Sequence, residues 1–258
     1  MDKYNGTKRI AVLLAGHEET VTIGCSGADV FRLAGHGETC FLKARPLCDN
    51  EPFEREAAVL EWLAPQVPVP RVLECGVDGE FEYLLTSAAI GVDATVAMEK
   101  MPFRELAAAL ADGLRRIHSL PIDTCPFDER LDVKLERAER NVNAGRVDEN
   151  DFDECRRGWS AMQVLAFLRS ERPAERDCVF SHGDYCLPNV MLEDGRVSGY
   201  IDLAGAGIAD RYNDLAIASR SVEHNLGQGY GDVFLECYGI ADLDDGLIEY
   251  YRAVDELF

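Results

Sequence analysis

The sequence contains no apolar run long enough to cross a membrane, because a spanning helix needs about 20 predominantly apolar residues. Its longest apolar segments, such as "IAVLLAG" and "LAAALADGL", are short or interrupted by charge. The first residues, "MDKYNGTKRI", lack the order of basic, apolar and small residues that marks a signal peptide. We therefore expect no membrane partner and a cytoplasmic location.

The cysteines form no CxxC pair, although the chain has 9 of them, so the sequence signals neither a zinc site nor a thioredoxin-like motif. They are scattered singly, which is typical of small apolar side chains in a reducing compartment. Basic residues are also scarce, with 26 Lys and Arg against 47 Asp and Glu and a net charge of -21. This balance argues against nucleic acid as a partner and favours cationic ligands.

Repeats and low-complexity linkers are absent, but the character of the 258-residue chain changes near residue 90. Before that point we predict strands, separated by glycines and turns, in "ETVTIG", "ADVFRLAG", "ETCFLKAR", "RVLECGV" and "FEYLLTSA". One helix is predicted over 53–64, where the apolar residues recur at helical spacing. The turn "GHGE" suits a hairpin.

After residue 90 helices dominate. They are predicted over 103–120, 130–145, 149–171, 211–226, 230–240 and 244–258. The segment "NVMLEDGRVSGYID" is typical of a hairpin with its turn at "EDG". The sequence thus predicts an α+β protein of two lobes, residues 1–88 and 89–258, with a ligand site between them.

Two carboxylates and an amide stand in a hydrophobic context in "SHGDYCLPNVMLEDGRVSGYIDL". Buried carboxylates are costly unless they are paired, hydrogen-bonded or bound to a cation. Asp202 follows an apolar strand and Asn189 can add an amide oxygen, and both are ligands that suit Mg²⁺. Asp184 lies on a glycine-containing loop and could orient or deprotonate a substrate hydroxyl. The order H-G-D-x-x-x-x-N followed by I-D predicts phosphoryl transfer.

Phosphoryl transfer also needs a cation for the nucleotide phosphates. Lys43 lies in the predicted strand "CFLKAR", with Phe41 on the same face. We expect Glu56 on the following helix to pair with Lys43; Glu54 is the alternative but lies on another helical face. The segment "GCSGADVF" is a small-residue turn whose backbone and Ser26 could cover the phosphates, although it is not a GxGxxG motif.

Taken together, these residues resemble the aminoglycoside 3'-phosphotransferases, a branch of the fold that eukaryotic protein kinases share. The resemblance extends over essentially the whole chain. It rests on "FLK", "EREAAVLEWL", "VPVPRVL", "LLTSA", "IHSL", "VFSHGD", "NVML", "GRVSGYIDL", "ADRYNDLA", "SRS" and "AVDELF". It implies a bilobal, protein-kinase-like fold, with an antiparallel N-terminal sheet and one helix before a mainly helical C-terminal lobe.

The resemblance also implies roles. Asp184 is the expected catalytic aspartate, and Asn189 and Asp202 are the expected Mg²⁺ ligands. ATP, or alternatively GTP, is the expected nucleotide. Its expected binding residues are Ser26 at the γ-phosphate, Phe41 stacked on adenine, the pair Lys43 and Glu56, and the hinge backbone from Ser87 to Ala89.

The implied acceptor is a cationic aminoglycoside, phosphorylated at the 3'-hydroxyl of kanamycin-type or neomycin-type compounds, which would confer antibiotic resistance. Its expected binding surface is acidic, with an arginine near the catalytic aspartate. The residues that match this surface are Asp151, Glu154, Arg220, Asp255, Glu256 and Phe258 with its terminal carboxylate. Asp151 and Glu154, three apart, are expected on one helical face.

Three positions depart from the family pattern on the substrate side: Gly205 replaces an arginine, and His224 and Asn225 replace acids. The acceptor spectrum therefore stays open, and the same chemistry on a macrolide, an amino sugar or choline is an alternative. A nucleotide-binding pseudokinase that acts by interaction is another, although no catalytic position is lost. A protein kinase is disfavoured because no "APE"-like segment follows Asp202. Whether the chain is a monomer or a homodimer is open.

Overall fold

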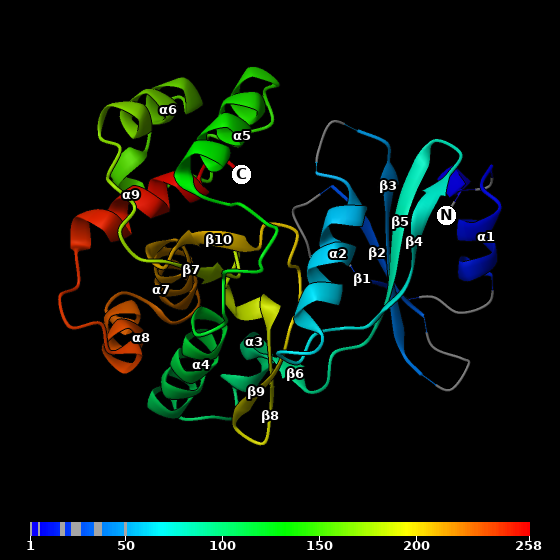
Figure 1. Ribbon diagram of the computed structural model, residues 1–258, viewed down its shortest axis with the longest axis horizontal. Helices are drawn as coiled ribbons and strands as arrows, with labels where there is room; N and C mark the ends of the chain where they lie inside the picture. The colour runs from blue at the N-terminus through cyan, green and yellow to red at the C-terminus, as the bar shows by residue number, and fades with distance from the viewer. Residues whose placement is uncertain (1, 5, 16–18, 22–26, 34–37, 49–50) are drawn as a thin grey trace. The chain divides into compact units, whose positions relative to one another are not determined.

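The computed structural model describes residues 2–4, 6–15, 19–21, 27–33, 38–48 and 51–258. The chain forms two compact units (Figure 1): unit 1 is Met1–Gly91 with Ser198–Ala204, and unit 2 is Val92–Val197 with Gly205–Phe258. The sequence predicts a division after residue 88, with all later residues in the second lobe. Contacts in the structure place Ser198–Ala204, which carries Asp202, with unit 1. None of the helices within the described ranges has the length and apolarity that a bilayer span requires.

Unit 1 is built on an antiparallel sheet, as the alternating segments predicted. In the described part of the chain it has five strands, in the order β1-β2-β3-β5-β4. They are β1 (Glu19–Val21), β2 (Asp29–Leu33), β3 (Cys40–Pro46), β4 (Val72–Asp78) and β5 (Phe81–Ser87). Lys43 of β3 lies opposite Val30 of β2 and Leu84 of β5, near the centre of the sheet.

Two helices cover opposite faces of this sheet (Figure 1). The predicted helix is α2 (Phe53–Leu63). The expectation of a single helix was wrong, because α1 (Arg9–Leu14) follows the short 3-10 turn Asp2–Tyr4. Ile10 and Leu14 of α1 are buried in one core cluster with Phe31, Leu42 and Ala44 of the sheet.

The first turn of α1 is capped only in part from nearby: the side chain of its N-cap residue, Lys8, accepts no hydrogen bond, and Thr7 Oγ1 accepts from Ala11 N at 3.1 Å. Its other backbone N–H groups donate to Asp78 at the end of β4, with Lys8 N at 3.0 Å and Ile10 N at 2.9 Å. An unsatisfied helix N-terminus would be costly, so Asp78 supplies the cap from about 70 residues away.

The start of α2 is also held by an acid from the sheet. Glu82 of β5 accepts from Arg45 Nε at 2.6 Å and from the backbone N of Phe53, the first residue of α2, at 3.0 Å. The Arg45 guanidinium lies 4.5 Å from the Phe53 ring centroid. Both charges are buried, and their pairing fixes the helix to the sheet one turn before Glu56.

Unit 2 is mainly helical, as predicted. Its described helices are α3 (Ala94–Ala97), α4 (Phe103–His118), α5 (Leu131–Asn143), α6 (Ala161–Ser170), α7 (Tyr212–Leu226), α8 (Tyr230–Tyr238) and α9 (Asp245–Asp255). Helix α7 packs on both α8 and α9, and α4 packs on α8. Every residue of α7 from Tyr212 to Ser219 is buried.

Two short sheets lie within these helices. The predicted hairpin is present as β8 (Val190–Glu193) and β9 (Arg196–Tyr200), with β6 (Val92–Asp93) beside β8. Asp194 and Gly195 both have positive φ, as a two-residue type I′ turn requires. The second sheet, β7 (Cys178–Ser181) paired with β10 (Gly207–Asp210), was not predicted.

The continuous helix predicted over 149–171 was wrong. The structure has a loop, a 3-10 turn at Glu154–Arg156 and then α6. Gly158 has a φ of +84°, which a right-handed helix does not contain. Ser160 begins a new helix with a capping box to Gln163.

The Glu82→Ala substitution tests the buried pair of unit 1. Removing one partner leaves the Arg45 charge uncompensated and uncaps α2, so we expect the free energy of unfolding to fall by about 3–5 kcal/mol. Urea unfolding followed by circular dichroism measures the change. Glu54→Ala is the matched control, because Glu54 is exposed on the same helix, and it should stay within about 0.5 kcal/mol of the parent. Equal midpoints for the two variants would contradict the assignment.

Candidate active site

Lys43 lies in a triad of charges within unit 1. Residues 41 and 43 of β3 point away from the core that Leu42 and Ala44 enter. Lys43 Nζ donates to the two Glu56 carboxylate oxygens at 2.7 and 3.0 Å and to Asp202 Oδ1 at 2.9 Å. The predicted Lys43–Glu56 ion pair is confirmed. Glu54 is exposed, so it is not the partner.

The two carboxylates of the triad differ in exposure. The Glu56 side chain is 4% exposed and the Asp202 side chain 40%. Burial raises the pKa of Glu56, and Lys43 opposes that rise. Burial by itself lowers the pKa of Lys43, but the two carboxylates raise it above its usual value and keep the ammonium charged.

Asp202 adopts an unusual backbone conformation, with a φ of +60°, two residues after β9 ends. A left-handed residue other than glycine is uncommon and costs free energy, so such residues often mark functional positions. The adjacent Leu203 backbone N–H donates to Glu56, which ties the segment to α2. The carboxylate is thereby aimed at Lys43 while it stays partly accessible.

The other predicted nucleotide-binding residues lie along the sheet of unit 1. Phe41 is half-buried on β3. Ser87 is buried at the end of β5, where its N–H donates to Arg71 O at 2.9 Å and its Oγ accepts from Arg71 N at 2.9 Å. Ala89 follows two residues later. Ser26 lies outside the described residues.

Asp184 and Asn189 come together in unit 2, on the loop that follows β7. Asn189 ends a 3-10 turn, Leu187–Asn189. Its Nδ2 donates to Asp184 Oδ2 at 2.7 Å and to the Asp184 carbonyl at 3.1 Å. With its amide nitrogen engaged in this way, Asn189 offers its Oδ1 as the donor atom for a cation. Their roles as catalytic and metal-binding residues stay predictions.

A third residue, Asp214, holds this loop, and the sequence reasoning missed it. Its Oδ1 accepts from Ser181 Oγ and Gly183 N, both at 2.9 Å. Its Oδ2 accepts from His182 N at 2.7 Å. Although the carboxylate is fully buried, which raises its pKa, the hydrogen bond from His118 and these donors lower the pKa to about 2. An ionised acid inside α7 therefore anchors the three residues before Asp184.

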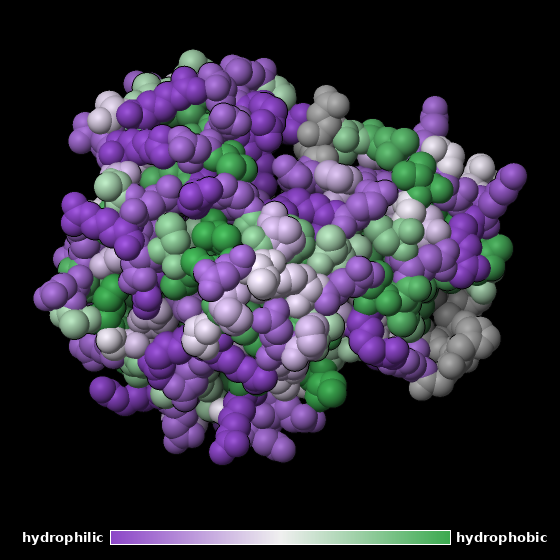
Figure 2. Space-filling view, viewed as in Figure 1, coloured by the Kyte–Doolittle hydropathy of each residue, from purple (hydrophilic) through white to green (hydrophobic). Residues whose placement is uncertain are grey.

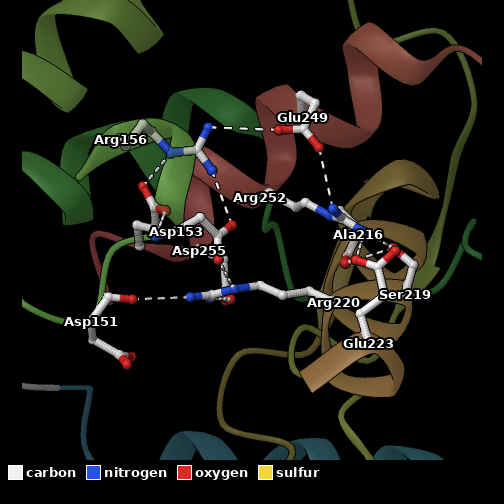
Figure 3. Close-up of polar contacts among 11 residues, drawn as sticks. Asp151, Asp153, Arg156, Ala216, Ser219, Arg220, Glu223, Glu249, Arg252 and Asp255 are labelled. Atoms are coloured by element: carbon white, nitrogen blue, oxygen red, sulfur yellow. Dashed lines mark hydrogen bonds and ion pairs between the residues drawn. The ribbon is translucent and has the colours of Figure 1, made fainter. Parts of the chain in front are cut away.

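Arg220 and Asp255, two of the predicted acceptor-binding residues, lie in a network of ion pairs in unit 2 (Figure 3). Arg220 of α7 pairs with Asp255 Oδ2 at 2.8 Å and donates to the Asp151 carbonyl at 3.3 Å. It also pairs at 3.0 Å with Asp153, a residue that the sequence reasoning missed. Burial raises the pKa of Asp255, and Arg220 opposes that rise.

The remaining predicted acids are placed differently. Glu256 is buried and paired with Arg156 at 2.5 Å. Glu154 is 83% exposed and lies 3.4 Å from Arg157. The shared helical face expected for Asp151 and Glu154 was wrong, because Asp151 precedes the 3-10 turn that starts at Glu154.

The Phe258 ring lies at the end of the chain described here, half exposed, beneath two cations of α5. Arg137 lies 5.1 Å and Lys134 5.7 Å from its centroid. Lys134 is buried, and this burial lowers its pKa although Glu129 opposes the shift. Cation–π contacts with α5 thus hold the Phe258 ring in place.

Comparison with known proteins identifies the family. Residues 18–257 match the phosphotransferase enzyme family. An aminoglycoside 3'-phosphotransferase of Streptomyces fradiae is 40% identical, over 94% of this chain and 96% of that protein. One from Niallia circulans is 36% identical over 98% of both.

Solved structures agree as well. The crystal structure of an aminoglycoside-3'-phosphotransferase of type VIII has a TM-score of 0.85 and 36% identity, covering 100% of this chain and 96% of that one. An aminoglycoside phosphotransferase from Streptomyces rimosus in complex with ADP and streptomycin has a TM-score of 0.79 and 32% identity, covering 96% and 97%.

The chain belongs to the phosphotransferase enzyme family. The resemblance to aminoglycoside 3'-phosphotransferases and the predicted kinase-like α+β class are thereby confirmed. Asp214 could have been found in the family string "ADRYNDLA", since it is an acid on the apolar face of a helix. Asp153 carries no comparable signal, because it lies in an irregular loop.

The backbone at residue 183 lies so close to the backbone at residue 205 that only glycine fits at position 183. Gly183 has a φ of +88°, and a Cβ there would lie 2.1 Å from the Gly205 carbonyl oxygen. By contrast, a Cβ on Gly205 would meet its nearest atom at 3.9 Å. Position 205 thus has room for a side chain, whereas position 183 does not.

We expect Gly183→Ala to abolish turnover of this phosphotransferase and to lower its melting temperature, because the methyl group clashes with backbone that cannot move aside. Gly205→Ala is the matched control, with the same added methyl group on the other side of the contact, and should melt close to the parent. Thermal unfolding and phosphoryl-transfer assays of both variants give the comparison. An active Gly183→Ala enzyme would refute the steric account.

Proposed function

We propose that this chain transfers the γ-phosphoryl group of ATP to a hydroxyl group of an aminoglycoside, at the 3'-position of kanamycin-type and neomycin-type compounds. The observation that carries the proposal is the pairing among the predicted phosphoryl-transfer residues: Lys43 paired with Glu56, Asp202 beside Lys43, and Asp184 bonded to Asn189. Relatives named aminoglycoside 3'-phosphotransferase, up to 40% identical over most of the chain, support the choice of acceptor. Phosphorylation of the antibiotic would confer resistance.

The exposure of the triad supports distinct roles for its two acids. Glu56 is buried and tied to Leu203, so it stays with Lys43 and orients the ammonium toward the nucleotide phosphates. Asp202 is more exposed and can exchange Lys43 for a cation that arrives with the nucleotide. Phe41 and the hinge from Ser87 to Ala89 would bind the base.

The donor atoms fit a magnesium ion. Mg²⁺ takes carboxylate and amide oxygens and completes its shell with water and phosphate oxygens. Asp202 and Asn189 would hold it, and when bound it would neutralise charge on the transferred group. The Asn189 amide group leaves its oxygen for this purpose, since its nitrogen is engaged by Asp184.

Asp184 would align the acceptor hydroxyl and take its proton. The hydroxyl oxygen forms a bond to the γ-phosphorus, and the bond from that phosphorus to the bridging oxygen of ADP breaks. The Asn189 amide fixes Asp184 Oδ2, and Asp214 fixes the preceding backbone, so the carboxylate is held in place before substrate binds. Such positioning is the main contribution a protein makes to phosphoryl transfer.

The acid network would bind the ammonium groups of the acceptor. Five carboxylates and three guanidiniums are linked there, which leaves a formal charge of −2: Asp153, Glu223, Glu249, Asp255 and Glu256 with Arg156, Arg220 and Arg252. The arginines hold the acids close together, and the excess negative charge favours a cation. Asp151 and Glu154 are exposed beside this network.

The test is ADP release by the purified chain with ATP and Mg²⁺ against kanamycin, neomycin, streptomycin, a macrolide and choline, with the product position mapped by ³¹P NMR. We expect turnover of kanamycin and neomycin and phosphate at the 3'-oxygen. Asp184→Asn should bind nucleotide as the parent does but lower kcat by about 100-fold or more. Turnover of only the macrolide or choline would replace the proposed acceptor, and an unchanged kcat in Asp184→Asn would remove its catalytic role.

Electrostatic steering gives a separate prediction for the acceptor. The net charge is -21, and hydrophilic residues cover most of the face seen in Figure 2. We expect kcat/KM for kanamycin to fall as ionic strength rises from about 0.01 to about 0.15 M, because the Debye length shortens from about 30 to about 8 Å.

A pair of variants with the same change in charge, one beside the network and one away from it, separates binding at this surface from the effect of net charge. Asp151→Asn removes an acid beside the network, whereas Asp123→Asn removes an exposed acid of unit 2 that makes none of the network's contacts. Asp151→Asn should lower kcat/KM and flatten its salt dependence more than Asp123→Asn does. Salt dependence that is absent in the parent, or the same in both variants, would count against binding at this surface.

A further inference from the structure

A buried chain of hydrogen bonds leads to Asp214 from the side opposite the catalytic loop. His118, the last residue of α4, places its Nε2 2.9 Å from Asp214 Oδ2 and its Nδ1 2.8 Å from the Tyr238 hydroxyl. Tyr238 ends α8, and its oxygen accepts from Arg211, at the start of α7, at 2.9 Å. Tyr238, His118 and Asp214, which follow Arg211 in this series of hydrogen bonds, are all buried.

Donor and acceptor chemistry fixes the direction of the bonds at the two ends of this chain, at Arg211 and at the ionised Asp214. Arg211 can only donate, so the Tyr238 oxygen accepts there. Burial raises the pKa of Tyr238, although Arg211 opposes that rise, so the hydroxyl keeps its proton and is able to donate it to His118 Nδ1, 2.8 Å away. His118 must then carry its own proton on Nε2, and this N–H donates to Asp214, which is ionised.

We propose that His118 is a positioning residue for phosphoryl transfer, held in its Nε2–H tautomer by Tyr238 and Arg211 so that it orients the Asp214 carboxylate. The inference rests on the proposed function for its effect on rate. His118 shares Asp214 Oδ2 with the His182 backbone N–H, while Ser181 and Gly183 hold Oδ1. Loss of the His118 proton donor would leave the carboxylate free to turn, and the residues before Asp184 would shift with it.

The loop cannot absorb such a shift elsewhere. Gly183 already packs against the backbone of Gly205 and Ala206. Asp184 N also lies 3.3 Å from His182 Nδ1. Because a displacement of about 1 Å at a reacting group can cost about 100-fold in rate, a turned Asp214 would lower kcat through Asp184 without touching the nucleotide-binding residues of unit 1.

A purely structural role for His118 makes different predictions. As a packed residue at a helix end, its replacement would lower stability but leave kcat unchanged, and any side chain of similar size would serve. As a positioning residue, it can be replaced only by a side chain that still donates to Asp214. Glutamine offers such a donor, whereas leucine does not.

The experiment compares His118→Gln, His118→Leu and Tyr238→Phe with Tyr250→Phe as the matched control. Tyr250 has a buried hydroxyl that donates to Leu168 O at 2.7 Å, outside this chain of bonds. In His118→Leu we expect kcat to fall about 10–100-fold with the KM for ATP unchanged, and in His118→Gln we expect most of that loss to be recovered. Tyr250→Phe should lower the melting temperature but not kcat.

Two NMR measurements test the arrangement independently of turnover. The ¹⁵N spectrum of the His118 ring should show the Nε2–H tautomer in the parent and a mixture of tautomers in Tyr238→Phe. Hydrogen exchange of the His182 and Gly183 amides should be at least about tenfold faster in His118→Leu but not in His118→Gln, since exchange follows local opening.

An Nδ1–H tautomer in the parent, or a kcat in His118→Leu equal to the parent's, would overturn the proposal. If no aminoglycoside is turned over, the proposed function fails, while slow amide exchange that depends on His118 would still support its hold on Asp214. Unchanged exchange in His118→Leu would overturn that hold.

Discussion

The buried carboxylate of Asp214 is the constraint on which the loop that carries Asp184 depends. It brings a full negative charge into the core of unit 2, and such a charge is tolerated only when several donors surround it. Three of those donors belong to residues 181–183, directly before Asp184. The need to satisfy one buried charge therefore fixes the backbone from which the predicted catalytic side chain projects, and the glycine at 183 allows the chain to come close enough.

In unit 1 the corresponding constraint is the charge of Lys43. A lysine in the middle of a sheet must be paired. Glu56 can pair with Lys43 only if α2 is fixed in position along the sheet. The Glu82 carboxylate does this by capping α2 and pairing with Arg45. The buried Arg45–Glu82 pair of the sheet thus holds the start of α2, and through Glu56 the position of that helix sets the orientation of the Lys43 ammonium group.

The acid network shows how a strongly acidic surface can remain ordered. Carboxylates that gather without cations repel one another, and burial raises the pKa of Asp255 and Glu256. Arg156 and Arg220 link them to Asp153 and hold them in place. What remains is an excess of negative charge on a rigid frame, and a polycationic ligand could bind it without first ordering the side chains.

The sequence by itself determined the elements and the chemistry that lies close together along the chain. Period-two strands, the helices α2, α4 and α7, the Asp194–Gly195 hairpin and the spacing of Asp184, Asn189 and Asp202 are local patterns, and the chemistry of those residue types already favours phosphoryl transfer. Only the tertiary structure decided what depends on distant partners. The cap that Asp78 gives to α1, the link of Asp153 to Arg220, the bond of His118 to Asp214 and the bonds of Asp214 to the loop join segments far apart in sequence. Local propensity has no term for a hydrogen bond whose partner is 31 or more residues away, so folding alone brings these groups together.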